Sequence, residues 1–394
     1  MNLTRVKFKD IEEIPKLKIT KNFKQQFQGS SPAPFIGRFG YPQVSIGILS
    51  PQFSGDMENY ASPRLWSTNN TKIDEIAANR YSLVNSKELH GINNLKGRFL
   101  EMVQEVGMGK QSEVEIILKK LPKLSLRSER EIIPYGPAAD IQKARITANT
   151  KIDLKIEKVI RDIDLKSVPA LTSLYQKGFE EAALSKLLSV GTLGLKKNRK
   201  LVPTRWSITA TDDIIGKELI CEIKEYPPGE YQAYFGGGWG NYYLLLFFPE
   251  VWSYELFETY LSSPVNPWSK QGYRYSTDYE SYQGRKSYAE ETAGGYYAAR
   301  ISILEKMKQN KRQASCLALR FITSAYNVPL GVWICREAAR KSCQSIALEF
   351  SSQKLLLQYA QNFIKAKFNF DLNLLLKESR LLKIKKLQTK LTQF

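Results

Sequence analysis

Two periodicities of apolar residues run along this chain, and they predict different elements. Val114, Ile116 and Leu118 recur with the two-residue period of a β-strand. In the centre of the chain we expect further strands at residues 206–211, 219–223, 231–235 and 242–248. Their spacing predicts an antiparallel meander, with a hairpin turn in the glycine-rich segment 236–241.

Apolar residues spaced three and four apart predict helices, most of them in the second half of the chain. The expected helices cover residues 171–188, 293–307, 317–322, 351–367 and 372–387. Helices that pack on a central, mostly antiparallel sheet define the α+β class. We therefore expect an α+β fold with a helical C-terminal half and flexible basic tails at both ends.

The length of 394 residues suffices for two or three domains. Gly29–Pro34 is rich in Gly, Ser and Pro, which predicts a linker. We expect a basic N-terminal arm at residues 1–30 and an α+β region at 31–230. A mostly helical α+β region at 231–375 and a basic helical tail at 376–394 complete the expected organisation.

The chain is strongly basic, with a formal net charge of +19. Residues 1–28 contain seven basic and three acidic residues, and residues 377–394 contain six basic and one acidic residue. Basic ends on a basic body favour a polyanionic partner, and DNA or RNA is the first candidate. The alternative is a lysine-rich composition of the kind found in thermophiles, which raises the charge without nucleic-acid binding.

Composition also limits the compartment and the metal chemistry. The longest purely apolar run, residues 242–248, is too short to cross a membrane, and the N-terminus has no apolar segment of a signal peptide. Cys221, Cys316, Cys335 and Cys343 are widely spaced, which predicts reduced core thiols in a cytoplasmic protein. His90 is the single histidine, so we expect no zinc site.

The last seven residues carry the most specific short motif. Gln388, Leu391 and Phe394 recur every third residue, so one turn of 3₁₀ helix would place them on one face. This pattern resembles the box with which replication and repair proteins hold the sliding clamp, PCNA. A second copy, from Gln353 to Tyr359, lies in a segment with helical periodicity, and we interpret it as part of a core-facing helix.

The densest polar segment of the body, residues 203–213, predicts a ligand site. If residues 206–211 form a strand, Arg205, Ser207, Thr209 and Thr211 share one face, where an arginine and three hydroxyls suit a phosphate. Trp206 would then face the core. The alternative is an ordinary strand whose polar end caps the next element. Further candidate ligands for the phosphate are Asp212, Arg38 and Arg300.

A second hypothesis for the body concerns catalysis. A strand with Glu222 and Lys224 on one face, downstream of Asp213, is the arrangement with which many nucleases hold Mg²⁺ beside a phosphodiester. The alternative is an exposed strand edge in a basic protein. A nuclease or a nucleotide-processing enzyme with Mg²⁺ as its possible cofactor is therefore our alternative to a binding protein.

Arginines are spread through the C-terminal half close to several tyrosines. They either form a basic and aromatic DNA surface or pair with the acidic residues Glu290, Glu291, Glu305 and Glu337. The arginines are Arg285, Arg300, Arg312, Arg320, Arg336 and Arg340.

Five blocks of the sequence carry a resemblance to a known family: Phe35–Pro42, Arg199–Asp213, Asp278–Glu280, Ala293–Arg300 and Pro329–Trp333. On these blocks, the chain from Ser31 to the end resembles the archaeal Nre family of DNA-repair proteins. The resemblance implies a role in DNA-damage repair, and clamp binding through Gln388, Leu391 and Phe394. Many members begin with a zinc-binding segment that contains paired cysteines, whereas this chain has no cysteine before Cys221.

Overall fold

The computed structural model describes residues 3–11, 22–123 and 130–387, and the chain divides into two compact units. Unit 1 comprises Met1–Pro15, Gly216–Asn327 and Ile334–Phe394. Unit 2 comprises Lys16–Ile215 and Val328–Trp333. Each unit has its own sheet and its own apolar core.

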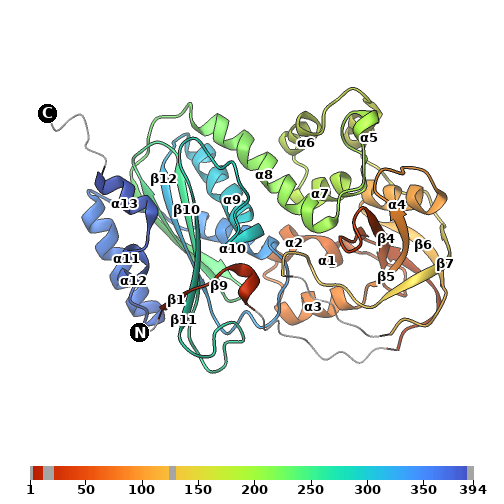
Figure 1. Ribbon diagram of the computed structural model, residues 1–394, viewed down its shortest axis with the longest axis horizontal. Helices are drawn as coiled ribbons and strands as arrows, with labels where there is room; N and C mark the ends of the chain where they lie inside the picture. The colour runs from red at the N-terminus through yellow and green to blue at the C-terminus, as the bar shows by residue number, and fades with distance from the viewer. Residues whose placement is uncertain (1–2, 12–21, 124–129, 388–394) are drawn as a thin grey trace. The chain divides into compact units, whose positions relative to one another are not determined.

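Unit 2 contains a six-stranded sheet with the order β2-β6-β7-β5-β4-β3, in which only the β5–β7 pair is parallel (Figure 1). The strands are β2 (Gln26–Ser31), β3 (Ala33–Ile36), β4 (Gln43–Ser50), β5 (Val84–Gly91), β6 (Ser112–Leu118) and β7 (Ala138–Ile146). Its helices are α1 (Glu58–Ala61), α2 (Pro63–Thr68), α3 (Ile73–Tyr81), α4 (Arg98–Met108), α5 (Leu154–Arg161), α6 (Ser167–Gln176), α7 (Glu181–Ser189) and the 3₁₀ turn η2 (Lys196–Asn198). The long helix α8 (Thr204–Ile223) begins in unit 2 and continues into unit 1.

The core of unit 2 forms between α4 and the sheet. Leu100, Val103 and Val106 recur at helical spacing on α4 and are buried. They join Val114 and Ile116, the inward-facing residues of β6, in one apolar cluster. The alternation seen in the sequence of β6 is therefore the consequence of one buried face and one more exposed face.

Unit 1 contains a seven-stranded sheet with the order β1-β11-β10-β12-β9-β8-β13, in which β1–β11 and β10–β12 are parallel pairs. The strands are β1 (Leu3–Arg5), β8 (Tyr231–Gly238), β9 (Asn241–Phe248), β10 (Ser253–Tyr260), β11 (Tyr273–Glu280), β12 (Ser315–Ile322) and β13 (Leu348–Phe350). Its helices are α9 (Ala293–Asn310), α10 (Trp333–Cys343), α11 (Gln353–Phe368), α12 (Asn373–Leu376), α13 (Arg380–Leu387) and the 3₁₀ turn η1 (Phe8–Asp10).

Unit 1 is built in three layers, with α9 and α10 on one face of the sheet and α11 to α13 on the other (Figure 1). Strand β10 shows how one strand serves both layers. Tyr254 contacts Tyr296 of α9, with 4.8 Å between the ring centroids. Phe257 lies three residues farther along the strand, so its side chain points to the opposite face of the sheet. It belongs to the apolar cluster that includes Leu356 and Ile364 of α11. Helix α11 contains the internal Gln-x-x-Leu-x-x-Tyr copy, and its Leu356 is fully buried.

The expected α+β class with mostly antiparallel pairing is confirmed, and the helices predicted at 293–307 and 351–367 are α9 and α11. The strands predicted at 231–235 and 242–248 form the expected hairpin, β8 and β9. The helix expected at 317–322 is wrong, because this segment is β12. Strand β12 pairs with β10 and β9 and is buried along its whole length, so it shows no two-residue alternation.

Two other expectations, a linker and a single long helix, are wrong at positions that contain glycine. The linker expected at Gly29–Pro34 is part of β2 and β3, and its residues are buried. Gly29 fits there because a Cβ atom would collide with the carbonyl oxygen of Pro51. The single helix expected at 171–188 is two helices, α6 and α7, because Gly178 adopts a φ of +89° between them.

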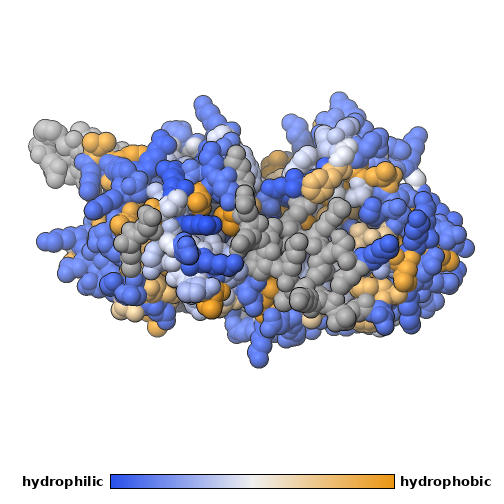
Figure 2. Space-filling view, turned by 60° about the horizontal axis from the view of Figure 1, so that its bottom comes forward, coloured by the Kyte–Doolittle hydropathy of each residue, from blue (hydrophilic) through white to orange (hydrophobic). Residues whose placement is uncertain are grey.

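The surface agrees with a chain rich in charged residues. On the face shown in Figure 2, hydrophilic side chains predominate, and hydrophobic side chains form small separate groups. Among the described helices, none combines the length and the apolar character needed to span a membrane. Each of the four cysteines is a free thiol, and Cys221 is exposed instead of lying in the core as expected.

A buried carboxylate holds the last described helix on the sheet. Glu255 of β10 is 1% exposed. It accepts hydrogen bonds from the Ser379 hydroxyl at 2.6 Å, from the Arg380 backbone N–H at 2.9 Å and from the Leu381 backbone N–H at 3.0 Å. These groups lie at the N-terminus of α13, where backbone N–H groups have no partner within the helix. Glu255 therefore acts as a cap supplied by a strand.

We predict that Glu255→Ala lowers the free energy of unfolding by about 1–3 kcal/mol, because it leaves buried donors without an acceptor. Urea denaturation measures this change. Glu378→Ala is the matched control, since Glu378 is an exposed carboxylate next to the same helix, and its ion pair with Lys383 is long, at 3.9 Å. Equal effects of the two substitutions would contradict the capping role.

A second prediction concerns pH. Burial raises the pKa of Glu255, although the Ser379 and backbone hydrogen bonds oppose the rise. The folded state thus binds this proton more tightly than the unfolded state, so the contribution of Glu255 to stability declines as pH rises through its folded pKa. We expect the difference in unfolding free energy between the wild type and Glu255→Gln to shrink from acidic to neutral pH. A difference that stays constant with pH would contradict this assignment.

Candidate nucleic-acid interface

Residues 204–223 form the helix α8 instead of the two strands that the sequence suggested. Their β-branched residues favour strands, but burial recurs at every fourth position, at Ser207, Thr211, Ile215, Leu219 and Ile223. The first turn closes with hydrogen bonds from Trp206 N–H and Ser207 N–H to the Pro203 carbonyl. The sequence thus contains residues spaced four apart that can share one helix face, and their burial in the folded protein overrides the strand propensity of this segment.

The helix separates the residues that a strand would have aligned. Ser207 and Thr211 face the interior, whereas Arg205 and Thr209 are partly exposed. The hydroxyl of Ser207 donates to the Thr204 carbonyl at 2.9 Å and contacts the Ser185 hydroxyl at 3.1 Å. The expected phosphate face of one arginine and three hydroxyls therefore does not form.

The charge of Arg205 is neutralised within unit 2. Its guanidinium forms an ion pair with Glu131, a carboxylate that is 5% exposed. Asp212, seven residues after Arg205 on α8, is fully buried. Arg205 and Glu131 therefore work as a structural pair that connects the start of α8 to the segment before β7.

The residues proposed to hold Mg²⁺ do not lie close together in the structure either. Asp213 and Glu222 are nine residues apart on α8, which corresponds to roughly 13–14 Å along a helix axis. Glu222 accepts hydrogen bonds from the Tyr226 hydroxyl at 2.9 Å and from Lys308 Nζ at 2.7 Å, and these partners lower its pKa against the opposing effect of burial. Lys224 lies over the ring of Tyr282.

Within the described residues, no group of three or more His, Cys, Asp and Glu side chains is arranged to hold a metal ion. The strand geometry that made Asp213, Glu222 and Lys224 a candidate Mg²⁺ site is therefore absent from this part of the chain.

Most of the arginines in the C-terminal half are held inside unit 1 by acidic partners. Arg300 is 2% exposed and donates to Glu280 at 2.8 Å. Arg320 pairs with Glu258, and the resulting charge pair is almost completely buried. Arg340 pairs with Glu305 at 2.7 Å. Pairing with acidic residues, the alternative considered from the sequence, holds in kind, but of these three arginines only Arg340 pairs with the partners expected there, Glu305 and Glu337. The partners of Arg300 and Arg320 are Glu280 and Glu258 instead. Arg300 is thus a structural residue of the α9 layer.

An exposed group of aromatic side chains instead marks unit 2. The turn between β3 and β4 presents Phe39 and Tyr41, which are 63% and 46% exposed. Trp206, at the start of α8, is 44% exposed and contacts Tyr41 with 5.1 Å between ring centroids. Arg38 lies over the Phe39 ring at 4.5 Å. Trp206, expected in the core, therefore lies on the surface and contacts a second exposed aromatic ring.

Three chain segments meet at these aromatic residues. The Ile92 N–H donates to the Pro42 carbonyl at 3.1 Å, and the Leu201 N–H donates to the Ile92 carbonyl at 3.0 Å. The Ile36 N–H donates to the Thr204 hydroxyl at 2.9 Å, which ties the turn to the start of α8. These bonds hold the chain side by side at Ile36 and Pro42, at Ile92, and at Leu201 and Thr204.

The same segments carry exposed cations. We use the name aromatic-basic surface for the aromatic residues and the basic residues of these three segments. It consists of Arg38, Phe39, Tyr41, Lys96, Arg98, Lys200 and Trp206.

Aromatic rings beside cations suit unpaired nucleic acid, because bases stack on the rings while phosphates approach the charges. The sequence signal was the pair of aromatic residues on either side of Gly40 in a turn that also carries Arg38. Gly40 has a φ of +84°, a conformation that favours glycine. The turn is closed by a hydrogen bond from the Gln43 N–H to the Gly40 carbonyl at 2.9 Å.

The tail motif of Gln388, Leu391 and Phe394 lies outside the described residues. The described chain reaches Leu387, the last residue of α13, whose side chain is 83% exposed. The anchored start of α13 thus leads to an exposed end immediately before the motif.

Comparison with known proteins places the whole chain. The family model described as "Archaeal Nre, N-terminal" matches residues 7–269, and "Archaeal Nre, C-terminal" matches residues 280–394. The chain is 33% identical to the DNA repair protein NreB of Archaeoglobus fulgidus over 94% of this chain and 92% of that protein. It is 35% identical to the DNA repair protein NreA of Haloferax volcanii, over 80% of this chain and 77% of the relative. No solved structure matches. The chain therefore belongs to the archaeal Nre family.

Proposed function

We propose that this protein acts in DNA repair, contacts DNA through the aromatic-basic surface, and is recruited to DNA by the sliding clamp PCNA. The repair role is supported by family membership, since the relatives in Archaeoglobus and Haloferax are named DNA repair proteins. In the proposal, the clamp contact is made by Gln388, Leu391 and Phe394.

The single observation that supports the DNA contact is the exposed, tilted ring contact of Tyr41 with Trp206, in the turn that also carries Arg38 and Phe39. Large aromatic side chains that stay in water cost free energy unless a ligand covers them. Arginines of unit 1 such as Arg300 and Arg320 are neutralised by ion pairs in the interior of the unit. The exposed cations of the aromatic-basic surface therefore are better placed to meet phosphates.

The clamp contact is argued from the motif and from the helix before it. Burying a leucine and a phenylalanine contributes about 1.5–3 kcal/mol each, while ordering a free segment costs about 2–5 kcal/mol. Such a contact is weak by itself. It becomes effective when the same molecule also holds DNA, because the second contact is then intramolecular.

The internal copy of the motif is a poor alternative for clamp binding. Leu356, its central residue, is fully buried in unit 1, and Tyr359 stacks on Phe363 of the same helix. We also place the protein in the cytoplasm, since its four cysteines are free thiols and suit a reducing compartment.

The first test of this proposal is the double substitution Tyr41→Ala/Trp206→Ala, measured by fluorescence anisotropy with a labelled single-stranded oligonucleotide. Stacking contributes about 1–3 kcal/mol per base, so we expect the affinity to fall at least roughly fivefold. Phe53→Ala is the matched control, because Phe53 is 47% exposed in the same unit and lies outside the aromatic-basic surface. DNA affinity that is equal in all three proteins would exclude this surface.

The second test is Leu391→Ala/Phe394→Ala in a quantitative binding assay with purified PCNA. We expect at least a roughly tenfold weaker interaction, because both apolar anchors are lost. Leu387→Ala removes an exposed leucine of α13 that precedes the motif, and it should leave clamp binding unchanged. Retained binding by the double variant would refute recruitment through these residues, whatever the result of the DNA measurement.

A further inference from the structure

Unit 1 contains a pocket of about 460 Å³ at one end of its sheet, on the face covered by α9 and α10. Its floor is formed by residues of β8 and β9, and the last turn of α9 forms one wall. Short strand β13 extends the floor, because Glu349 pairs in register with Gln232 of β8. A volume of this size is within the roughly 300–1,000 Å³ of small-molecule sites.

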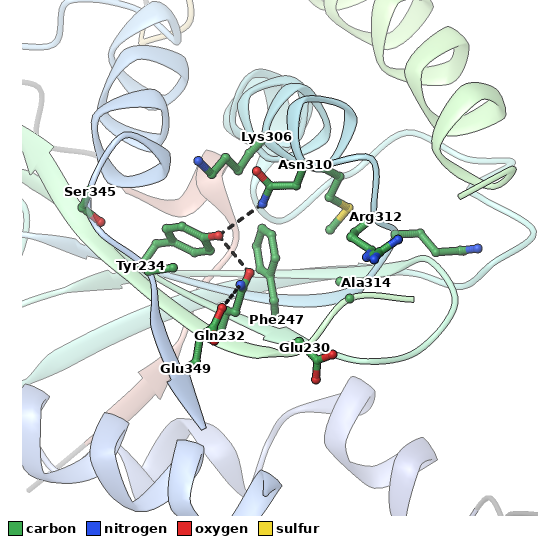
Figure 3. A pocket seen from close by; sticks show the side chains of 14 residues that line it. Glu230, Gln232, Tyr234, Phe247, Lys306, Asn310, Arg312, Ala314, Ser345 and Glu349 are labelled. Atoms are coloured by element: carbon green, nitrogen blue, oxygen red, sulfur yellow. Dashed lines mark hydrogen bonds between the residues drawn. The ribbon is translucent and has the colours of Figure 1, made fainter. Parts of the chain in front are cut away.

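Aromatic rings form the back of the pocket. Tyr234 and Phe247 lie side by side with 5.2 Å between their ring centroids. Both point from the sheet toward α9, and Lys306 and Asn310 approach them from that helix (Figure 3). The Lys306 ammonium lies over the Tyr234 ring at 5.4 Å. Tyr234 and Phe247 are only 2% and 3% exposed, so a flat ring that enters the pocket would meet a small part of their aromatic surface, with cationic and amide groups at its edge.

A chain of hydrogen bonds fixes the polar side chains of the floor (Figure 3). The Tyr234 hydroxyl donates to Gln232 Oε1 at 2.9 Å, and Gln232 Nε2 donates to Glu349 Oε1 at 3.0 Å. Asn310 Nδ2 donates to the Tyr234 hydroxyl at 3.4 Å. Burial raises the pKa of Tyr234, so its hydroxyl keeps its proton and its role as donor at neutral pH. The floor is therefore organised before any ligand arrives.

The charges around the pocket are divided between its walls. Lys306 and Arg312 come from the end of α9 and the residues after it, whereas Glu230 and Glu349 come from the strand side (Figure 3). Among the residues that the structure describes, Arg312 and Glu230 have no ion-pair partner, and both are exposed at the mouth. The lining thus offers cations to an anionic group and carboxylates to a donor group, with a net charge of zero.

We infer that this pocket binds a nucleotide whose base carries an exocyclic amino group. The base enters the pocket next to the small exposed part of Tyr234 and Phe247, its amino group donates to a carboxylate of the strand side, and its phosphate meets Lys306 and Arg312. The same chemistry is presented by a free mononucleotide and by a nucleotide turned out of a DNA strand. This inference does not rest on clamp binding or on the aromatic-basic surface, since all of its residues lie in unit 1.

The test measures dAMP binding by isothermal titration calorimetry with the full chain, and it compares wild type with Arg312→Ala. We expect binding by the wild type, and at least roughly tenfold weaker binding by the variant, because a charge-assisted contact to phosphate is lost. Binding of dTMP, whose base has no exocyclic amino group, should be weaker than that of dAMP. No binding of dAMP, or equal binding by wild type and variant, would overturn the inference.

Two matched controls separate this site from general charge effects. Lys311→Asn removes a neighbouring positive charge that does not line the pocket, and asparagine tolerates the φ of +50° at this position. Trp206→Ala alters the aromatic-basic surface in unit 2. Both variants should bind dAMP like the wild type, and a loss equal to that of Arg312→Ala would contradict a specific pocket.

The two sources of the nucleotide are distinguished by competition. A DNA duplex with one unpaired adenosine is added to the complex with dAMP, and a fully paired duplex of the same length is the reference. Stronger displacement by the unpaired duplex, lost in Arg312→Ala, identifies DNA as a source. Equal displacement by the two duplexes restricts the pocket to free nucleotides, and both results retain the nucleotide site that dAMP binding established.

Discussion

Unit 1 is organised by the need to find partners for three glutamates buried in the middle of its sheet. Glu255, Glu258 and Glu280 are each 1% exposed, and an isolated carboxylate in such a place would cost several kcal/mol. Glu255 is satisfied from one face by the N-terminus of α13. Glu258 and Glu280 are satisfied from the opposite face, by Arg320 of β12 and Arg300 of α9. The two helical layers are thus positioned by the charges of the sheet between them.

This arrangement decides which basic residues remain for a partner. Arg300 touches Gly216 so closely that a Cβ atom at residue 216 would displace the guanidinium, which confirms that the arginine belongs to the interior. The abundance of arginine in this half of the chain is therefore a packing feature. Basic residues that can meet a polyanion lie instead on turns and helix ends. Lys96 and Lys200 are exposed, and Arg38 lies over the exposed ring of Phe39.

Much of the fold was predictable because many elements have one buried face. The alternation in β6 and the helical spacing in α9 and α11 identified these elements from local sequence. Strand β12 was not predictable in this way, since burial on both faces removes the alternation. Helix α8 was misread because its β-branched residues favour strands, while the burial of every fourth residue depends on tertiary contacts. The predicted sites depended on the predicted elements. The row of hydroxyls on one face requires a strand, so it does not exist on helix α8. The contact of Tyr41 with Trp206 joins segments far apart in the sequence, so local sequence could not predict it.

The capping of α13 also has a mechanical consequence. Its start is fastened to β10 by three hydrogen bonds on one carboxylate, and the same first turn buries Leu381 and Leu382 in the unit 1 core. Lys385 forms an ion pair with Glu250 farther along the helix. A force applied to the residues after Leu387 is therefore transmitted through α13 to the sheet of unit 1.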